Sequence, residues 1–164
     1  MTDTKPSAWL DGLPYRLWRA NQAVHQRVID AIAELDVSVT QLGICVHLDE
    51  LGHMSASDLA RLFRLTPQST SAALNALEKR GWVVRIPHPV HKRVIWYELT
   101  AEGLAGTKRG HELVAGVNAE VTDVLTAEQQ EQLAQLTQTL TAAFGGIEVR
   151  QGTLWPVAGA RQGR

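Results

Sequence analysis

The stretch TPQSTSAALNALEKRG, residues 66–81, predicts a short helix with an unusual surface. Thr66 is a good N-cap, Pro67 suits the first helical position, and Gly81 marks a C-terminal end. Helical spacing places four residues on a side that packs against the protein body: Thr70, Ala73, Leu74 and Leu77. The opposite side carries small or polar, mostly uncharged residues: Gln68, Ser69, Ser71, Ala72, Asn75 and Lys79.

The neighbouring segments complete a winged helix-turn-helix. Upstream, MSASDLARLFRL contains Ser55 and Asp58 at the spacing of a capping box, and a turn of three to four residues leads into the next helix. Downstream, WVVRI (82–86) and RVIWYEL (93–99) predict two strands, joined by a loop that ends in Lys92 and Arg93.

A helix with such a face is suited to the major groove of DNA. Short side chains allow close approach, and amide and hydroxyl groups can meet base edges and phosphates. The basic loop between the strands would reach the adjacent groove or its phosphates. Taken alone, this pattern is equally typical of an ordinary amphipathic helix whose polar side binds nothing. The basic strand pair that follows the helix favours DNA binding.

The flanking segments predict long helices. Apolar residues recur at helical spacing over residues 8–35, on a stripe wide enough to face both its own domain and a partner subunit. Further helices are expected at about 101–122 and 127–144. The predicted organisation is a dimerisation helix in 1–37, a winged domain in 38–100, dimerisation helices in 101–145 and a tail in 146–164. The predicted fold class is mainly α with a small β wing.

Charge and composition restrict the classes of function. The chain of 164 residues has net charge −1, but residues 56–99 hold seven Lys/Arg against three acids. A basic middle between acidic flanks suits an embedded DNA-binding module. The sequence shows neither a transmembrane run nor a secretory signal, so we expect a cytoplasmic protein. It contains no motif of a catalytic site, so we expect no enzyme, and we expect no metal and no cofactor.

Residues 40–103 resemble the MarR family of bacterial transcription regulators. The resemblance is carried by the helix end LEKRG, the R-x-P at residues 85–87, the wing arginine Arg93 and the final LTxxG at residues 99–103. It implies a winged-helix homodimer that binds a pseudo-palindromic operator in double-stranded DNA. Such proteins are mostly repressors, released by a small ligand, often an aromatic acid, or by oxidation.

The sequence departs from the family pattern at three places. His91 replaces the aspartate that usually orients the wing arginine, and Ala72 replaces a residue that is often basic. The first helix also lacks the reactive cysteine that the family's redox branch keeps there. The family's ligand pocket lies between the dimerisation helices and the winged domain, so Trp18 and His47 are candidate ligand contacts. The residues expected to contact DNA are Thr66, Gln68, Ser69, Ser71, Ala72, Asn75, Lys79, Arg85, His91, Lys92 and Arg93.

Several alternatives stay open. A winged helix can also be a protein-interaction module, and a ligand-binding dimer can lose DNA recognition. A redox-responsive regulator would need a reactive Cys45, whereas the apolar surroundings of this residue predict a buried, inert thiol. A metal-responsive regulator would need ligands grouped from six scattered histidines, and the sequence shows no such group.

Overall fold

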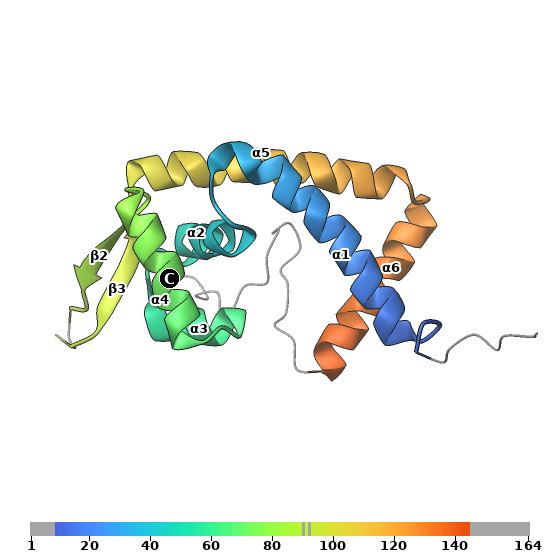
Figure 1. Cartoon of the computed structure of the whole chain (residues 1–164), viewed down its shortest axis with the longest axis horizontal. Helices are drawn as coiled ribbons and strands as arrows, with labels where there is room; N and C mark the ends of the chain where they lie inside the picture. The colour runs from blue at the N-terminus through green and yellow to red at the C-terminus, as the bar shows by residue number, and fades with distance from the viewer. Residues whose placement is uncertain (1–8, 90, 92, 145–164) are drawn as a thin grey trace, which may run out of the picture.

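The computed structural model describes residues 9–89, 91 and 93–144. It is mainly helical with a small β wing, which confirms the predicted fold class (Figure 1). The elements in chain order are α1 (Leu13–Ile32), the short 3-10 helix η1 (Ala33–Leu35), α2 (Val39–Leu51), β1 (Met54–Ser55), α3 (Ala56–Phe63), α4 (Pro67–Lys79), β2 (Val83–Pro87), β3 (Ile95–Leu99), α5 (Ala101–Asp123) and α6 (Ala127–Ala143).

The molecule has two parts that α5 connects. The winged part contains α2, α3, α4 and the strands, and it lies at the left of Figure 1. Helix α5 runs along the top of that view, and α1 and α6 project from its other half. Two ion pairs hold α1 and η1 to α5: Arg27 with Glu120, and Glu34 with Arg109.

The sheet has three antiparallel strands in the order β1-β3-β2, so the prediction of two strands was incomplete. Strand β1 is only two residues long, with Met54 opposite Tyr97 and Ser55 opposite Trp96. Two residues are too few to show the alternation that identifies a strand. Strands β2 and β3 pair from Val83–Leu99 to Pro87–Ile95.

The caps predicted at Ser55 and Thr66 both form, and further helices begin with caps of the same kind. Capping boxes form at Ser38–Gln41, Ser55–Asp58 and Thr126–Gln129. Helix α1 differs, because it begins at Leu13 rather than near residue 8. Gly12 caps it and the following proline lies in its first turn, a position where the missing N–H of proline has no cost.

A buried cluster holds the winged part together. Its fully buried side chains include Leu42 and Ile44 of α2, Leu59 of α3, Leu74 of α4 and Val83 of β2. Burying such side chains is the main favourable term in folding. The cluster therefore fixes which side of α4 faces inward.

Helix α5 approaches the winged part through glycines. A Cβ on Gly103 would lie 2.0 Å from the backbone oxygen of Trp82, and one on Gly106 would lie 2.3 Å from the Trp82 ring. On Gly110 it would lie 2.5 Å from Leu42. Only residues without side chains allow this close contact. Within the described residues, no helix is both long and apolar enough to cross a membrane.

Candidate nucleic-acid interface

Helix α4 presents its small polar side to solvent. Thr70, Leu74 and Leu77 are buried, as their spacing predicted. The opposite residues are all exposed: Gln68, Ser69, Ser71, Ala72, Asn75 and Lys79. The side of α4 that the sequence predicts to contact DNA is thus exposed on this chain.

The turn before α4 fixes the direction of the helix. Arg64 has φ 50°, and the N–H of Leu65 donates to the carbonyl of Ala60 at 3.0 Å, which closes α3. Thr66 then caps α4, because its hydroxyl accepts from the N–H of Ser69 at 3.0 Å. The two hydroxyls of Thr66 and Ser69 lie 2.8 Å apart. Both residues are candidate DNA contacts, and the structure places them together at the helix start.

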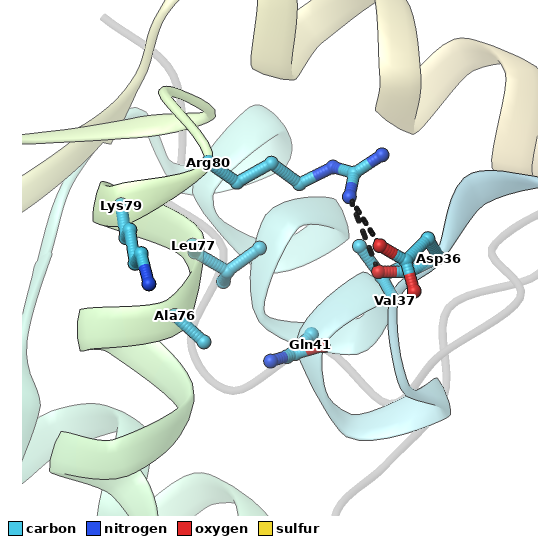
Figure 2. Close-up of a pocket in the computed structure, with 7 residues that line it drawn as sticks. All are labelled: Asp36, Val37, Gln41, Ala76, Leu77, Lys79 and Arg80. Carbon is cyan, nitrogen blue, oxygen red and sulfur yellow. Dashed lines mark hydrogen bonds and ion pairs between the residues drawn. The ribbon is translucent and has the colours of Figure 1, made fainter.

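The end of α4 is fixed as firmly. Gly81 has φ 81°, a conformation that favours glycine, and the N–H of Trp82 donates to the carbonyl of Leu77 at 3.0 Å. Arg80 lies over the Trp82 ring, 5.0 Å from its centroid, and reaches Asp36 at 3.2 Å. Figure 2 shows this ion pair at the edge of a surface cavity between η1–α2 and α4.

The wing contributes the remaining candidates. Arg85 on β2 turns toward α4, where its Nη2 lies 2.9 Å from Oδ1 of Asn75 and 2.8 Å from a carboxylate oxygen of Glu78. His91 and Arg93 are exposed beyond the end of β2. Lys92 lies outside the described residues. The structure therefore joins Arg85 of the wing to α4, a contact that the sequence pattern does not reveal.

Ion pairs neutralise part of the basic middle of the chain. Arg61 pairs with Asp58, Arg80 with Asp36, and Arg85 with Glu78. Lys79 and Arg93 form no ion pair with any residue that the structure describes. Both side chains are exposed.

Histidines gather on Trp96 at the base of the wing. The rings of His53 and His88 lie 3.7 and 4.1 Å from the Trp96 ring, between centroids. The backbone N–H of His91 donates to Nδ1 of His88 at 2.9 Å. His91 is thus tied to its own loop through its backbone, in the place where the family has an aspartate. No group of three or more His, Cys, Asp or Glu residues suited to a metal ion occurs in the described part of the chain.

The two candidate ligand residues have different surroundings. His47 is buried, with Nδ1 donating to the carbonyl of Gly43 at 2.8 Å and its ring against Phe63. Trp18 is 54% exposed and stacks on Tyr15. Neither lines the cavity between α1 and α5.

That cavity has a volume of about 380 Å³. Six valines from α1, α2 and α5 line it, together with Asn21, His25 and Asn118. None of these residues is a candidate ligand contact in the sequence pattern. Valine at helical spacing signals only a packed face, so nothing in the pattern distinguished a cavity wall from a core.

Cys45 is buried, as predicted, and the burial raises the pKa of its thiol to about 12. A hydrogen bond with Thr107 opposes this shift but is the smaller effect. A thiolate is the reactive form of cysteine. The position therefore has the chemistry of a core residue.

Comparisons with known proteins agree with this architecture. The sequence profile of the MarR family matches residues 27–94. An HTH-type transcriptional repressor of Mycobacterium tuberculosis is 30% identical over 128 residues, which cover 78% of this chain and 92% of that protein. These matches define the class: the chain belongs to the MarR family of transcriptional regulators, as the resemblance predicted.

Two solved structures show the same fold. The transcriptional repressor CouR, bound to a 23-mer DNA duplex, has a TM-score of 0.78 and 25% identity, covering 85% of this chain and 99% of its own. The organohalide-sensing regulator RdhR in its 2,4-dichlorophenol-bound form has a TM-score of 0.72 and 19% identity, covering 87% and 88%. Transcriptional regulation is thus the activity of the relatives with which this chain aligns.

Proposed function

We propose that this protein is a homodimeric, sequence-specific DNA-binding repressor that a small ligand releases from its operator. The observation that carries the proposal is the exposed polar side of α4, held at both ends by capped turns beside a wing. The fold likeness to CouR on its DNA duplex supports it. Such a protein would act in the cytoplasm, where bacterial DNA lies.

The first test is selection of a duplex from random sequences, followed by titration at several salt concentrations. Specific binding would give a preferred sequence and an affinity that falls steeply with salt, because phosphate contacts release counterions. Changing Gln68 to Ala should relax the base preference, since an amide reads base edges. Changing Arg93 to Ala should weaken binding to all duplexes and lower the salt slope by about one unit.

The homodimer is supported by apolar side chains that one chain leaves exposed. Leu13 and Trp18 of α1 are 74% and 54% exposed, and Leu136 of α6 is 63% exposed. Helix α6 has no buried residue at all. Helices with unsatisfied apolar faces commonly form interfaces. A two-fold dimer would place two α4 helices roughly 34 Å apart, one turn of DNA.

The effector site is best assigned to the cavity between α1 and α5. Its volume of about 380 Å³ falls within the range of small-molecule sites. Its valines suit an apolar body, and His25, Asn21 and Asn118 supply hydrogen bonds. Because no Lys or Arg among the described residues lines the cavity, a phenol fits it better than a carboxylate. The phenol-bound state of RdhR is a fold-level parallel.

A cavity-filling variant tests the effector site. Changing Val24, which is 41% exposed, to Trp should occupy the cavity with little strain elsewhere. The variant should bind the selected duplex like wild type but should resist release by phenols that release wild type. Unchanged release would place the effector elsewhere.

A protein-interaction module is the second candidate, because ion pairs occupy Arg61, Arg80 and Arg85 and leave few free cations for phosphate. Salt dependence separates the two functions. A mainly apolar protein contact would change little with ionic strength, whereas DNA binding would weaken steeply.

A further inference from the structure

Strand geometry directs Arg85 toward the recognition helix. Successive side chains of a strand point to opposite faces, so Arg85 lies on the same face as the buried Val83. It stands directly opposite Tyr97 of β3 in the pairing register. Its guanidinium accordingly lies over the Tyr97 ring, 5.7 Å from the centroid.

From this position Arg85 contacts two residues one helical turn apart on α4. Its Nη2 lies 2.9 Å from Oδ1 of Asn75 and 2.8 Å from Oε2 of Glu78. One nitrogen with two hydrogens can serve both acceptors. Arg85 thus contacts both α4, through Asn75 and Glu78, and the sheet, through the ring of Tyr97.

The contact determines which way the Asn75 amide faces. An asparagine amide without a partner can turn its oxygen or its NH2 group toward either side. Arginine has only donors, so it binds Oδ1 of Asn75 and leaves the Nδ2 donor for another partner. Asn75 therefore offers its donor in one defined direction on the exposed side of the helix.

The contact also changes what Arg85 can do. Glu78 neutralises the guanidinium at 2.8 Å, and both side chains are partly exposed, at 36% and 48%. A compensated charge is a weak partner for a phosphate. Geometry and charge both make Arg85 suited to orienting a neighbour rather than to holding the DNA backbone.

We propose that Arg85 is a positioning residue for base readout, acting through the amide of Asn75. The proposal rests on the proposed DNA-binding function and deepens it. Arg85 of the wing would hold the Asn75 amide in one orientation, and that orientation would select the base that Asn75 contacts. Loss of Arg85 should then remove discrimination at one base position, instead of weakening the grip on every sequence.

The test uses the full chain and the duplex selected by wild type, with each base pair replaced in turn. Fluorescence anisotropy gives a base-preference profile and a salt slope for each variant. Arg85→Gln should lose discrimination, by about fivefold or more, at the same base pair as Asn75→Ala, with the salt slope unchanged. In the double variant, Arg85→Gln should add nothing to the Asn75→Ala profile.

Arg93→Ala is the matched control, because it removes a wing arginine that has no ion pair among the described residues. The proposal is overturned if Arg85→Gln behaves like this control, with an intact base profile, uniform weakening and a salt slope lower by about one unit. Additive effects in the double variant would overturn it as well. If wild type selects no sequence, the failure belongs to the proposed function itself.

Glu78→Gln provides a second arm that leaves Arg85 and Asn75 in place, in case Arg85→Gln does not fold. Removing the neutralising carboxylate should keep the base profile and steepen the salt slope by about one unit, since the guanidinium becomes available to phosphate. An altered base profile with an unchanged slope would contradict the roles assigned to this group of residues.

Discussion

At the scale of single residues, the thiol of Cys45 shows how burial controls reactivity. Burial raises the pKa of the thiol to about 12, so the thiol form predominates at pH 8. We therefore expect Cys45 to react poorly with oxidants while the chain is folded. The raised pKa also makes the free energy of unfolding depend on pH. The contribution of the protonated thiol is complete below the pKa of the unfolded chain, and it is lost as the pH rises from that value toward the folded-state pKa.

We expect Cys45 to resist a thiol reagent such as DTNB in the native protein at pH 8 and to react promptly in guanidinium chloride. The absorbance of the released thiolate measures both rates. The same protein should lose stability from about pH 9 upward, where the unfolded chain begins to ionise its thiol. Rapid labelling of the folded protein would reopen a redox role.

Asp58 gives the opposite pH dependence. Its pKa is lowered, first by the hydrogen bond from Ser55 and further by Arg61. A depressed folded-state pKa gives stability that is present above the unfolded value and lost as pH falls. In urea unfolding, wild type should therefore exceed Asp58→Asn in stability at pH 7, and the difference should shrink below about pH 4. A difference that grows on acidification would contradict the capping role.

At the scale of elements, α5 depends on glycine where it meets the winged part. Changing Gly103 to Ala should destabilise the protein by about 2 kcal/mol or more, because the new Cβ would meet the backbone oxygen of Trp82, which cannot move as a side chain can. Urea unfolding measures the change. We expect both the sheet and the start of α5 to be affected.

Gly116 is the matched control on the same helix, because a Cβ there would meet nothing within 4 Å. Changing it to Ala should stabilise α5 by about 0.5–1 kcal/mol through helix propensity and reduced freedom of the unfolded chain. Equal effects at Gly103 and Gly116 would mean that the close approach to Trp82 contributes nothing.

At the scale of the whole molecule, α1 and α6 leave apolar side chains exposed on a single chain, which supports the proposed dimer. Changing Leu136 to Glu should disrupt a dimer, since a charge would be buried against apolar side chains of the second subunit. Light scattering after gel filtration should show a dimer for wild type and monomer for the variant. The control variant Gln135→Glu places the same charge one position away on α6, and it should keep the molecular mass of the dimer. A monomeric wild type would refute the dimer directly.

The sequence by itself determined the local structure and the fold class. Caps such as Thr66 and Ser55 act on backbone groups within three residues, and helical spacing of Leu74 and Leu77 shows which side of α4 is buried. These signals are local, so they can be read without coordinates. The family resemblance was carried by such local motifs and was confirmed.

Only the tertiary structure decided which distant residues meet. The contact of Arg85 with Asn75, the two-residue strand β1 and the valine-lined cavity each join segments that are separate along the chain. Trp18 and His47 were both predicted as candidate ligand contacts. In the structure Trp18 is exposed and stacks on Tyr15, whereas His47 is buried in the core. These contacts depend on how the packed elements are arranged in space. The periodicity of one segment shows which of its sides is buried but not which other segment packs against that side.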